Sequence, residues 1–192
     1  MTPEEKNLKE RALSYEAAYF EDFTFKPGSI AGDVLLYSSK NIMNPSRSKA
    51  CRYYEPCEHE PWVQTSIDRY SFKIKDLGEC GGRCEGGCII IHPERVDSRE
   101  TLLHEMIHAY ENQLREPLQQ LLSVRLYTKL KTDRKLKRQI DNLDYTILKQ
   151  AHVDEYIMFG GSRTAVHGTL FFLKCIDLEN RLKLPLGTIY GY

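Results

Sequence analysis

Two histidines and a glutamate in TLLHEMIHAYE, residues 101 to 111, have the types and the spacing of a catalytic zinc site. An α-helix turns through about 100° per residue, so His104 and His108 would lie on one face and could reach one ion. Glu105 would lie one step around the helix, where it can accept a proton but is poorly placed to be a ligand. Zinc lowers the pKa of its water to about 7, and the carboxylate takes the proton as the water attacks a carbonyl.

The alternative is a charged helix with two histidines, because a bare H-E-x-x-H pattern often occurs by chance. The flanking residues favour the zinc site. Leucine, methionine and isoleucine surround the histidines, and Asp97 with Glu100 forms a capping-box pattern that predicts a helix start near Ser98. The preceding segment CIIIH, 88 to 92, predicts a strand whose edge could take a substrate strand. We therefore expect hydrolysis of peptide bonds in a protein or peptide substrate.

A catalytic zinc site uses three protein ligands, so one more must come from elsewhere in the chain. We predict His167, which lies in AVHGTLFF at the start of an apolar helix. Glu155 and His152, in HVDEY, are the alternatives, and Glu155 would give a site of two histidines and one glutamate. Tyr110 and Tyr156 are both candidates for a hydrogen bond to the oxyanion, and the sequence does not select one.

The elements that must position these residues follow from hydrophobic periodicity and from breaker residues. We expect helices over 3 to 22, from about 98 to Pro117, over 118 to 150 in one or two pieces, and over 163 to 182. We expect strands over 33 to 39, 69 to 77 and 88 to 92, a Gly-rich turn over 79 to 88, and an extended C-terminal tail. One helix, a small sheet and then helices indicate a single α+β domain, residues 1 to 192.

The segment TLLHEMIHAY, preceded by a short strand and followed by HGTLFF at 167 to 172, resembles the SprT-like family of zinc metalloproteases. That family includes the Spartan enzymes, which degrade proteins crosslinked to DNA. The resemblance implies a zincin-like fold with a small sheet packed on helices, zinc on His104, His108 and His167, and Glu105 as the base. The long interval between the second and third ligands would then hold an inserted helical hairpin, residues 113 to 155.

The chain has six cysteines. Five of them could form a second, structural zinc site, pair as disulfides in an exported protein, or remain thiols: Cys51, Cys57, Cys80, Cys84 and Cys88. Cys175 lies in an apolar helix, where we expect a buried thiol that packs as a small hydrophobe.

The net charge is zero, with 27 basic and 27 acidic residues, so the whole chain has no general attraction to nucleic acid or to anionic membranes. A local basic segment could still contact DNA phosphates through four side chains: Lys131, Arg134, Lys135 and Arg138. The N-terminus has no apolar core of a signal peptide, and no apolar run is long enough for a membrane helix. We expect an intracellular protein, cytoplasmic or nuclear, with no membrane partner.

Two other functions are compatible with the same residues. One is a non-catalytic protein that zinc stabilises and that binds nucleic acid or regulates a partner. The presence of Glu105 favours the enzyme, because binding alone needs no base. The other is an exported zincin toxin or effector, whose cysteines would form disulfides, so a count of reactive thiols would separate it from the intracellular protease.

Overall fold

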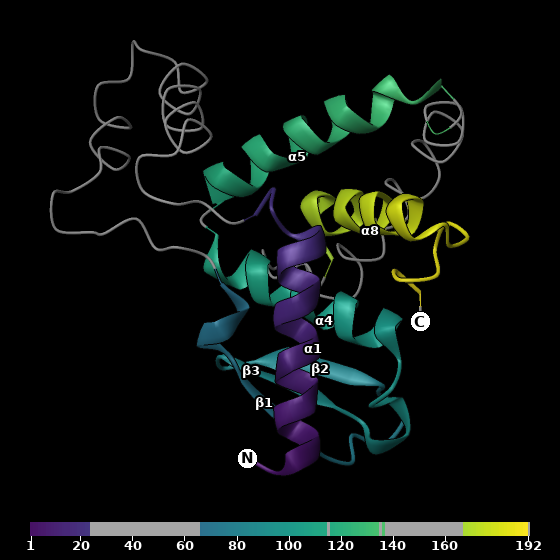
Figure 1. Cartoon of the computed structure of the whole chain (residues 1–192). Helices are drawn as coiled ribbons and strands as arrows, with labels where there is room; N and C mark the ends of the chain where they lie inside the picture. The colour runs from purple at the N-terminus through teal and green to yellow at the C-terminus, as the bar shows by residue number, and fades with distance from the viewer. Residues whose placement is uncertain (24–65, 115, 135, 137–166, 192) are drawn as a thin grey trace, which may run out of the picture. The chain divides into compact units, whose positions relative to one another are not determined.

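The computed structural model describes residues 1–23, 66–114, 116–134, 136 and 167–191 (Figure 1). These residues divide into two compact units, the first Met1–Leu121 and the second Leu122–Gly191. A three-stranded sheet and four α-helices give the described part a mixed α+β fold. None of the described helices is both long and apolar enough to cross a membrane. The predicted strand at 33 to 39 lies outside the described residues.

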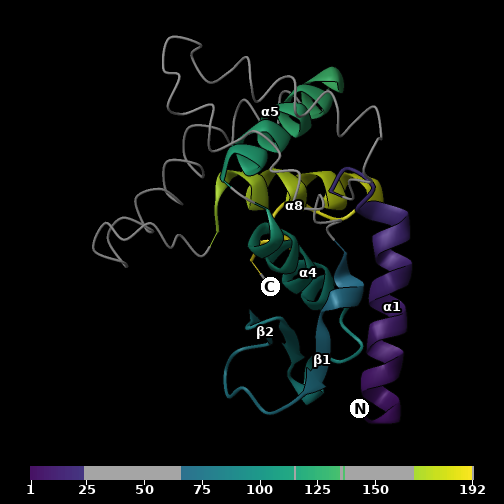
Figure 2. The same cartoon turned by 90° about the vertical axis from the view of Figure 1, so that its left-hand side faces the viewer.

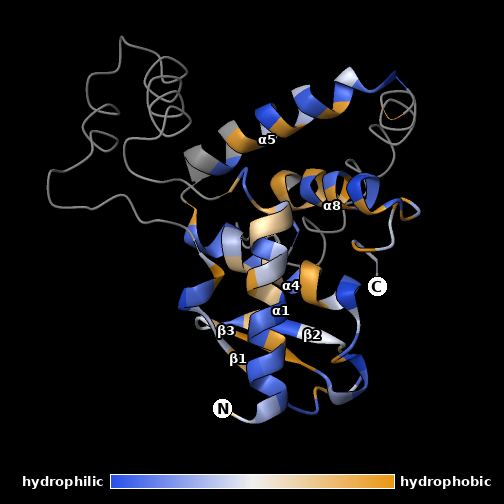
Figure 3. Cartoon of the chain, in the orientation of Figure 1, coloured by the Kyte–Doolittle hydropathy of each residue, from blue (hydrophilic) through white to orange (hydrophobic). Residues whose placement is uncertain are grey.

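In the first unit, helix α1 (Pro3–Tyr19) begins at a capping box. The Thr2 hydroxyl accepts a hydrogen bond from the Glu5 amide at 3.2 Å, and the Glu5 carboxylate accepts one from the Thr2 amide at 2.7 Å. Two amides that a helix start leaves unpaired are thus satisfied. α1 is largely hydrophilic in Figure 3, and its buried stripe packs on the sheet strand β1, Ser71–Ile74. The helix predicted over 3 to 22 is confirmed as far as Tyr19.

The sheet has the strand order β1-β3-β2, where β2 is Gly82–Glu85 and β3 is Cys88–Ile91. β3 pairs parallel with β1 and antiparallel with β2, so its apolar residues occupy the centre of the sheet. A two-residue turn joins β2 to β3. Gly86 and Gly87 have φ of 55° and 74° in this turn, and a tight hairpin of the I′ type requires positive φ at both positions.

Two predictions about this sheet are wrong. The segment 79 to 88, predicted to be a turn, contains the strand β2, because pairing with β3 orders residues whose local composition favours a turn. The segment 88 to 92, predicted to offer an edge to a substrate, forms the central strand, and both its sides are occupied. Among the described strands, the edge next to the H-E-x-x-H helix belongs to β2.

Helix α4 (Arg99–Gln113) carries the H-E-x-x-H residues. It begins at Ser98, whose hydroxyl accepts a hydrogen bond from the Thr101 amide at 3.1 Å. The cap is therefore Ser98 and not the predicted Asp97, whose side chain is exposed. Residues 101 to 107 are all buried, and the helix packs on β2, β3 and α1. In Figure 1, α4 crosses behind α1 and lies above the sheet, and Figure 2 shows α1 running alongside both α4 and the sheet.

The second unit contains most of α5 (Glu116–Thr132) and all of α8 (Thr169–Leu182). A stripe of buried leucines, one per turn, runs along α5: Leu122, Leu126 and Leu130. The buried Asp177 carboxylate on α8 lies 3.0 Å from Nζ of Lys174 and 3.1 Å from Nζ of Lys129. Because Lys129 belongs to α5, one carboxylate links the two helices.

The boundaries of these helices differ from the sequence prediction. α8 has Gly168 as its N-cap, and residues 167 and 168 are not helical although they lie within the helix predicted over 163 to 182. Of the predicted insertion, α5 and the residues up to Leu136 are described in part, and residues 137 to 155 lie outside the described residues.

The tail after α8 is folded, and the prediction of an extended tail is wrong. Lys183 adopts the left-handed conformation at φ 56°, and the Leu184 amide donates to the Glu179 carbonyl at 2.8 Å, which closes the helix end. The Gly191 amide then donates to the Gly187 carbonyl at 2.9 Å, so the chain turns a second time.

Candidate metal centre

His104 and His108 lie one turn apart on α4, as their spacing predicts. Their ring centroids are 5.0 Å apart, and the ring planes make an angle of 71°. The His104 side chain is buried, whereas His108 is partly exposed. Two imidazoles at this separation can each direct one nitrogen to a common ion.

A carboxylate from the next turn of α4 lies beside His108. Nδ1 of His108 is 3.8 Å from Oε2 of Glu111, and both side chains are less than a fifth exposed. A carboxylate near one imidazole nitrogen favours the proton on that nitrogen, which leaves the other nitrogen as the metal ligand. Glu111 therefore favours the tautomer of His108 that binds a metal through Nε2.

Glu105 is 2% exposed and packs against the edge strand β2. A Cβ atom placed on Gly82 would lie 2.8 Å from both Cγ and Oε1 of Glu105, closer than carbon side chains approach in proteins. The absence of a side chain at Gly82 therefore leaves the space that the Glu105 carboxylate occupies. A buried glutamate held against a strand has few alternative positions, which suits a group that must meet a substrate in one geometry.

Cys84 on β2 also lies near this carboxylate. Burial raises the pKa of the Cys84 thiol to about 12, and the negative charge of Glu105 adds to the shift. The Asn112 amide lies 3.7 Å from the Cys84 sulfur, within hydrogen-bonding range for sulfur. The raised pKa disfavours the thiolate, which is the reactive form of cysteine.

His167 belongs to the second unit and lies just before the N-cap of α8. Its ring centroid is 4.4 Å from that of Phe171 and 5.2 Å from that of Tyr190. Burial lowers the pKa of His167 below the ordinary histidine value. This shift favours the neutral imidazole, which is the form that binds metals.

The group formed by His104, His108 and His167 could hold a metal ion, because their ligand atoms all lie within 4.8 Å of one another. In the described ranges, no other set of three or more His, Cys, Asp or Glu side chains has this property. Three imidazole nitrogens suit zinc, and they also suit copper, iron and nickel, so the donor set restricts the metal without identifying it.

The alternative third ligands, Glu155 and His152, lie outside the described residues, as does Tyr156. Tyr110 is fully buried, and its hydroxyl donates to the carboxylate of Glu16 on α1. Tyr110 therefore joins two helices of the first unit, and this contact gives no support to a role at an oxyanion.

Three of the five cysteines predicted for a second metal site are described. All three are free thiols: Cys84 lies on β2, Cys88 begins β3, and Cys80 lies just before β2. The Cys80 thiol donates a hydrogen bond to the Gly82 carbonyl at 2.9 Å. Cys51 and Cys57 lie outside the described residues, so the second site stays a prediction. Cys175 is buried in α8, as expected.

Of the four predicted DNA contacts, Lys131 and Arg134 are described. The ammonium of Lys131 lies 3.9 Å from the centre of the Tyr127 ring, and Arg134 is exposed. Lys135 and Arg138 lie outside the described residues. Lys129 of the same basic segment is paired with Asp177, so it is a structural cation.

Sequence reasoning missed three residues around the candidate centre: Gly82, Glu111 and Tyr190. A glycine inside an alternating strand pattern signals a close approach of another group, and Gly82 would have been found if the strand had been recognised. Glu111 follows His108 at the i, i+3 spacing of neighbouring side chains, which is a usable local signal. Tyr190 has no local signal, because its contact with His167 depends on how the tail folds.

No family model, curated protein or solved structure matches the chain.

Proposed function

We propose that the protein is a zinc-dependent endopeptidase with a zincin-like fold, similar to the SprT-like metalloproteases. The observation that carries the proposal is the closeness of the ligand nitrogens of His104, His108 and His167, with Glu105 buried next to the first histidine. Three imidazoles fit a catalytic zinc, which takes three protein ligands and keeps one position open.

The chain's own residues have distinct roles in this proposal. Zinc, when bound, would supply a Lewis acid that lowers the pKa of a water to about 7. Glu105 takes the proton from the attacking water and returns it to the leaving amine, as a general base and then a general acid. Glu111, whose carboxylate lies 3.8 Å from Nδ1 of His108, would favour a proton on that nitrogen and leave Nε2 for the metal. The absence of a side chain at Gly82 leaves the space that the Glu105 carboxylate occupies.

The edge of β2 that pairs with no described strand is the surface that we propose for the substrate. β2 pairs with β3 alone among the described strands, and it packs on the helix that carries Glu105. An extended peptide can add to such an edge through main-chain hydrogen bonds, which hold many sequences in one register. A substrate strand on β2 would lie close to Glu105, because Gly82 of this strand is in contact with that side chain.

DNA-associated proteins are a candidate substrate class, through the basic segment on and after α5. Reversing Lys131, Arg134, Lys135 and Arg138 to glutamate should then abolish a salt-sensitive affinity for DNA, because each phosphate contact contributes to the salt slope. A wild-type protein without DNA affinity at low salt would remove this substrate class and leave the peptidase proposal intact.

Glu105→Gln is the experiment that separates an enzyme from a zinc-stabilised binding protein. The variant keeps the size of the side chain and removes the base, so zinc content should equal that of wild type. Cleavage of an unfolded protein such as labelled casein should fall by roughly 10²- to 10⁴-fold. Glu94→Gln, at an exposed position, is the matched control and should change neither quantity. Equal cleavage by wild type and Glu105→Gln would end the proposal.

The third ligand is tested by zinc content after dialysis. His167→Ala should lose most of the zinc, as should His104→Ala, whereas His92→Ala should not. His92 is the matched histidine control, because its Nε2 is paired with Asp76 at 3.2 Å. If His167→Ala keeps full zinc and Glu155→Ala loses it, the site has two histidines and one glutamate. The proposed similarity to the SprT-like enzymes would then be wrong.

A further inference from the structure

The chain after α8 folds back and places an aromatic ring on His167. The Tyr190 ring centroid is 5.2 Å from that of His167, 6.2 Å from that of Phe171 and 5.7 Å from that of Phe172. Phe171 and Phe172 are buried in the first turn of α8, so Tyr190 closes one side of a small aromatic cluster. The imidazole of His167 thus has Phe171 and Tyr190 as ring neighbours within the second unit.

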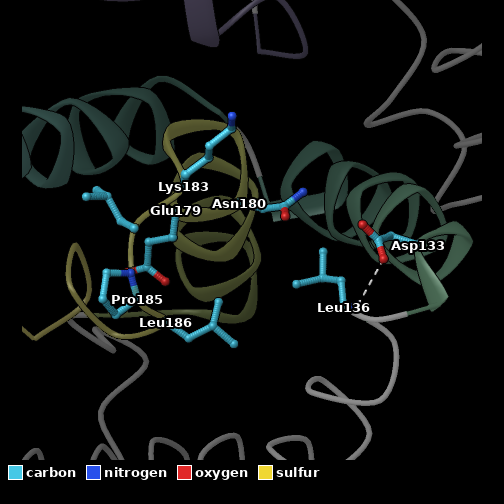
Figure 4. A pocket seen from close by; sticks show the side chains of 8 residues that line it. Asp133, Leu136, Glu179, Asn180, Lys183, Pro185 and Leu186 are labelled. Atoms are coloured by element: carbon cyan, nitrogen blue, oxygen red, sulfur yellow. Dashed lines mark hydrogen bonds between the residues drawn. The ribbon is translucent and has the colours of Figure 1, made fainter.

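A buried carboxylate holds the turn that carries Tyr190. Glu179 is 1% exposed, and its Oε2 accepts a hydrogen bond from the Gly187 amide at 2.9 Å. Its Oε1 accepts one from the Ile189 amide at 2.6 Å. Burial raises the pKa of Glu179, and hydrogen bonds from the amides of Ile189, Gly187 and Tyr190 oppose the shift. Figure 4 shows the Glu179 side chain between α8 and the returning segment at Pro185.

This arrangement specifies the position of the turn more narrowly than apolar packing would. Two carboxylate oxygens receive amides from two positions of the same turn, and a displaced turn would leave a buried carboxylate without donors. An unsatisfied buried acceptor costs about 1 to 3 kcal/mol or more when it is charged. The Tyr190 ring, which is next in sequence to Ile189, is consequently fixed against α8.

We propose that Glu179 and Tyr190 are positioning residues for His167: Glu179 holds the C-terminal turn, and the Tyr190 ring on that turn fixes the orientation of the imidazole as a metal ligand. This inference rests on the proposed zinc site. His167 precedes the helix, so the backbone of α8 does not restrain it as α4 restrains His104 and His108. A ligand whose side chain is fixed before binding loses less freedom when the metal arrives, and groups that orient a ligand contribute about 10- to 100-fold in metal affinity.

The experiment compares full-length wild type with Tyr190→Leu, Tyr190→Phe and Glu179→Gln. Zinc affinity is measured by competition with a chromophoric chelator, and the visible spectrum is recorded with Co²⁺ in place of zinc. Tyr190→Leu should bind zinc about 10-fold more weakly and change the Co²⁺ spectrum. Tyr190→Phe keeps the ring and should restore both readouts to wild-type values. Glu179→Gln should weaken zinc binding in the same direction, because one side of an amide presents a donor to a backbone amide.

Two further samples assign the effect to the imidazole. Glu10→Gln, on the exposed face of α1, is the control for losing a carboxylate and should leave zinc affinity unchanged. In a His167→Ala background, Tyr190→Leu should have no additional effect, because residues that act through one another are not additive.

The outcomes separate this inference from the function on which it rests. A wild-type protein that binds no zinc overturns the proposed function. If Tyr190→Leu has wild-type zinc affinity and an unchanged Co²⁺ spectrum, the inference alone is overturned. The same holds if Tyr190→Leu lowers zinc affinity equally in the wild-type and His167→Ala backgrounds. If Glu179→Gln fails to fold, by circular dichroism of the metal-free protein, the three samples at Tyr190 still decide the result.

Discussion

Gly82→Ala tests whether the edge strand sets the position of the general base. The added Cβ would lie 2.8 Å from Cγ and Oε1 of Glu105 and 3.1 Å from Cδ. Favourable contacts between carbon atoms begin near 3.5 Å, so the carboxylate must move by about 0.7 Å. Glu105 is 2% exposed, so it cannot swing into solvent without opening the packing around it.

The expected magnitudes follow from this displacement. Overpacking a buried site costs about 1 to 3 kcal/mol of unfolding free energy. A 1 Å error in the position of a catalytic group costs about 100-fold in rate, so we expect kcat to fall by roughly 10- to 100-fold. Zinc content should stay at the wild-type level, because the three atoms nearest to the new methyl group all belong to Glu105 and none to a histidine.

The control is Gly87→Ala in the hairpin turn. Its Cβ would meet nothing within 4 Å, but the φ of 74° makes alanine unfavourable by about 1 to 2 kcal/mol. The two variants should therefore lose similar stability in urea unfolding, while only Gly82→Ala loses casein cleavage. Cleavage by Gly82→Ala at the wild-type rate would contradict a role of Gly82 in placing the base, as would a loss of activity in both variants in proportion to their loss of stability.

Three further predictions concern the carboxylates and the metal. Glu111→Gln should weaken zinc binding about 10-fold, measured by chelator competition, whereas Glu100→Gln on the same helix should not, because Glu100 pairs with Arg99. Asp177→Asn should lower the unfolding free energy by about 1.5 to 3 kcal/mol, because it weakens the charged hydrogen bonds that Asp177 accepts from Lys174 and Lys129. Burial alone would raise the pKa of Asp177, but Lys174 and Lys129 hold that pKa below its usual range. The difference in unfolding free energy between wild type and Asp177→Asn should therefore be complete above about pH 4, the ordinary pKa of aspartate. It should shrink as the pH falls through the lower pKa of Asp177 in the folded protein. Unfolding curves at a series of pH values measure this difference, and an equal difference at all pH values would contradict the prediction. Removing zinc with a chelator should lower the thermal midpoint, since zinc at 100 times its dissociation constant stabilises by about 2.7 kcal/mol, and an unchanged midpoint would argue against binding to the folded protein.

The elements that sequence predicted well are those whose signals are local. The start of α1 near Pro3, the spacing of His104 and His108, and the β-branched run before α4 each depend on neighbours within four residues. Side chains at i and i+4 share a helix face whatever surrounds the helix. The paired histidines could therefore be predicted without knowledge of the fold.

The features that sequence did not predict depend on partners far along the chain. Residues 82 to 85 form a strand because β3 pairs with them, although the glycines in and around this segment indicate a turn. The tail folds because Glu179 accepts amides from Gly187 and Ile189, and no periodic pattern marks this pairing. Ser98 and Asp97 are both good caps by type, so only the geometry of the Thr101 amide distinguishes them.

The two ends of the segment 24 to 65 are fixed to one place on α4. Phe23 packs on Tyr110 with ring centroids 5.5 Å apart, and the Ser66 amide donates to the Gln113 side chain at 3.0 Å. The framework of the first unit thus holds both ends of this segment through its own contacts. Because both contacts are made by described residues, Tyr110→Ala or Gln113→Ala would each remove the contact that holds one end of this interval.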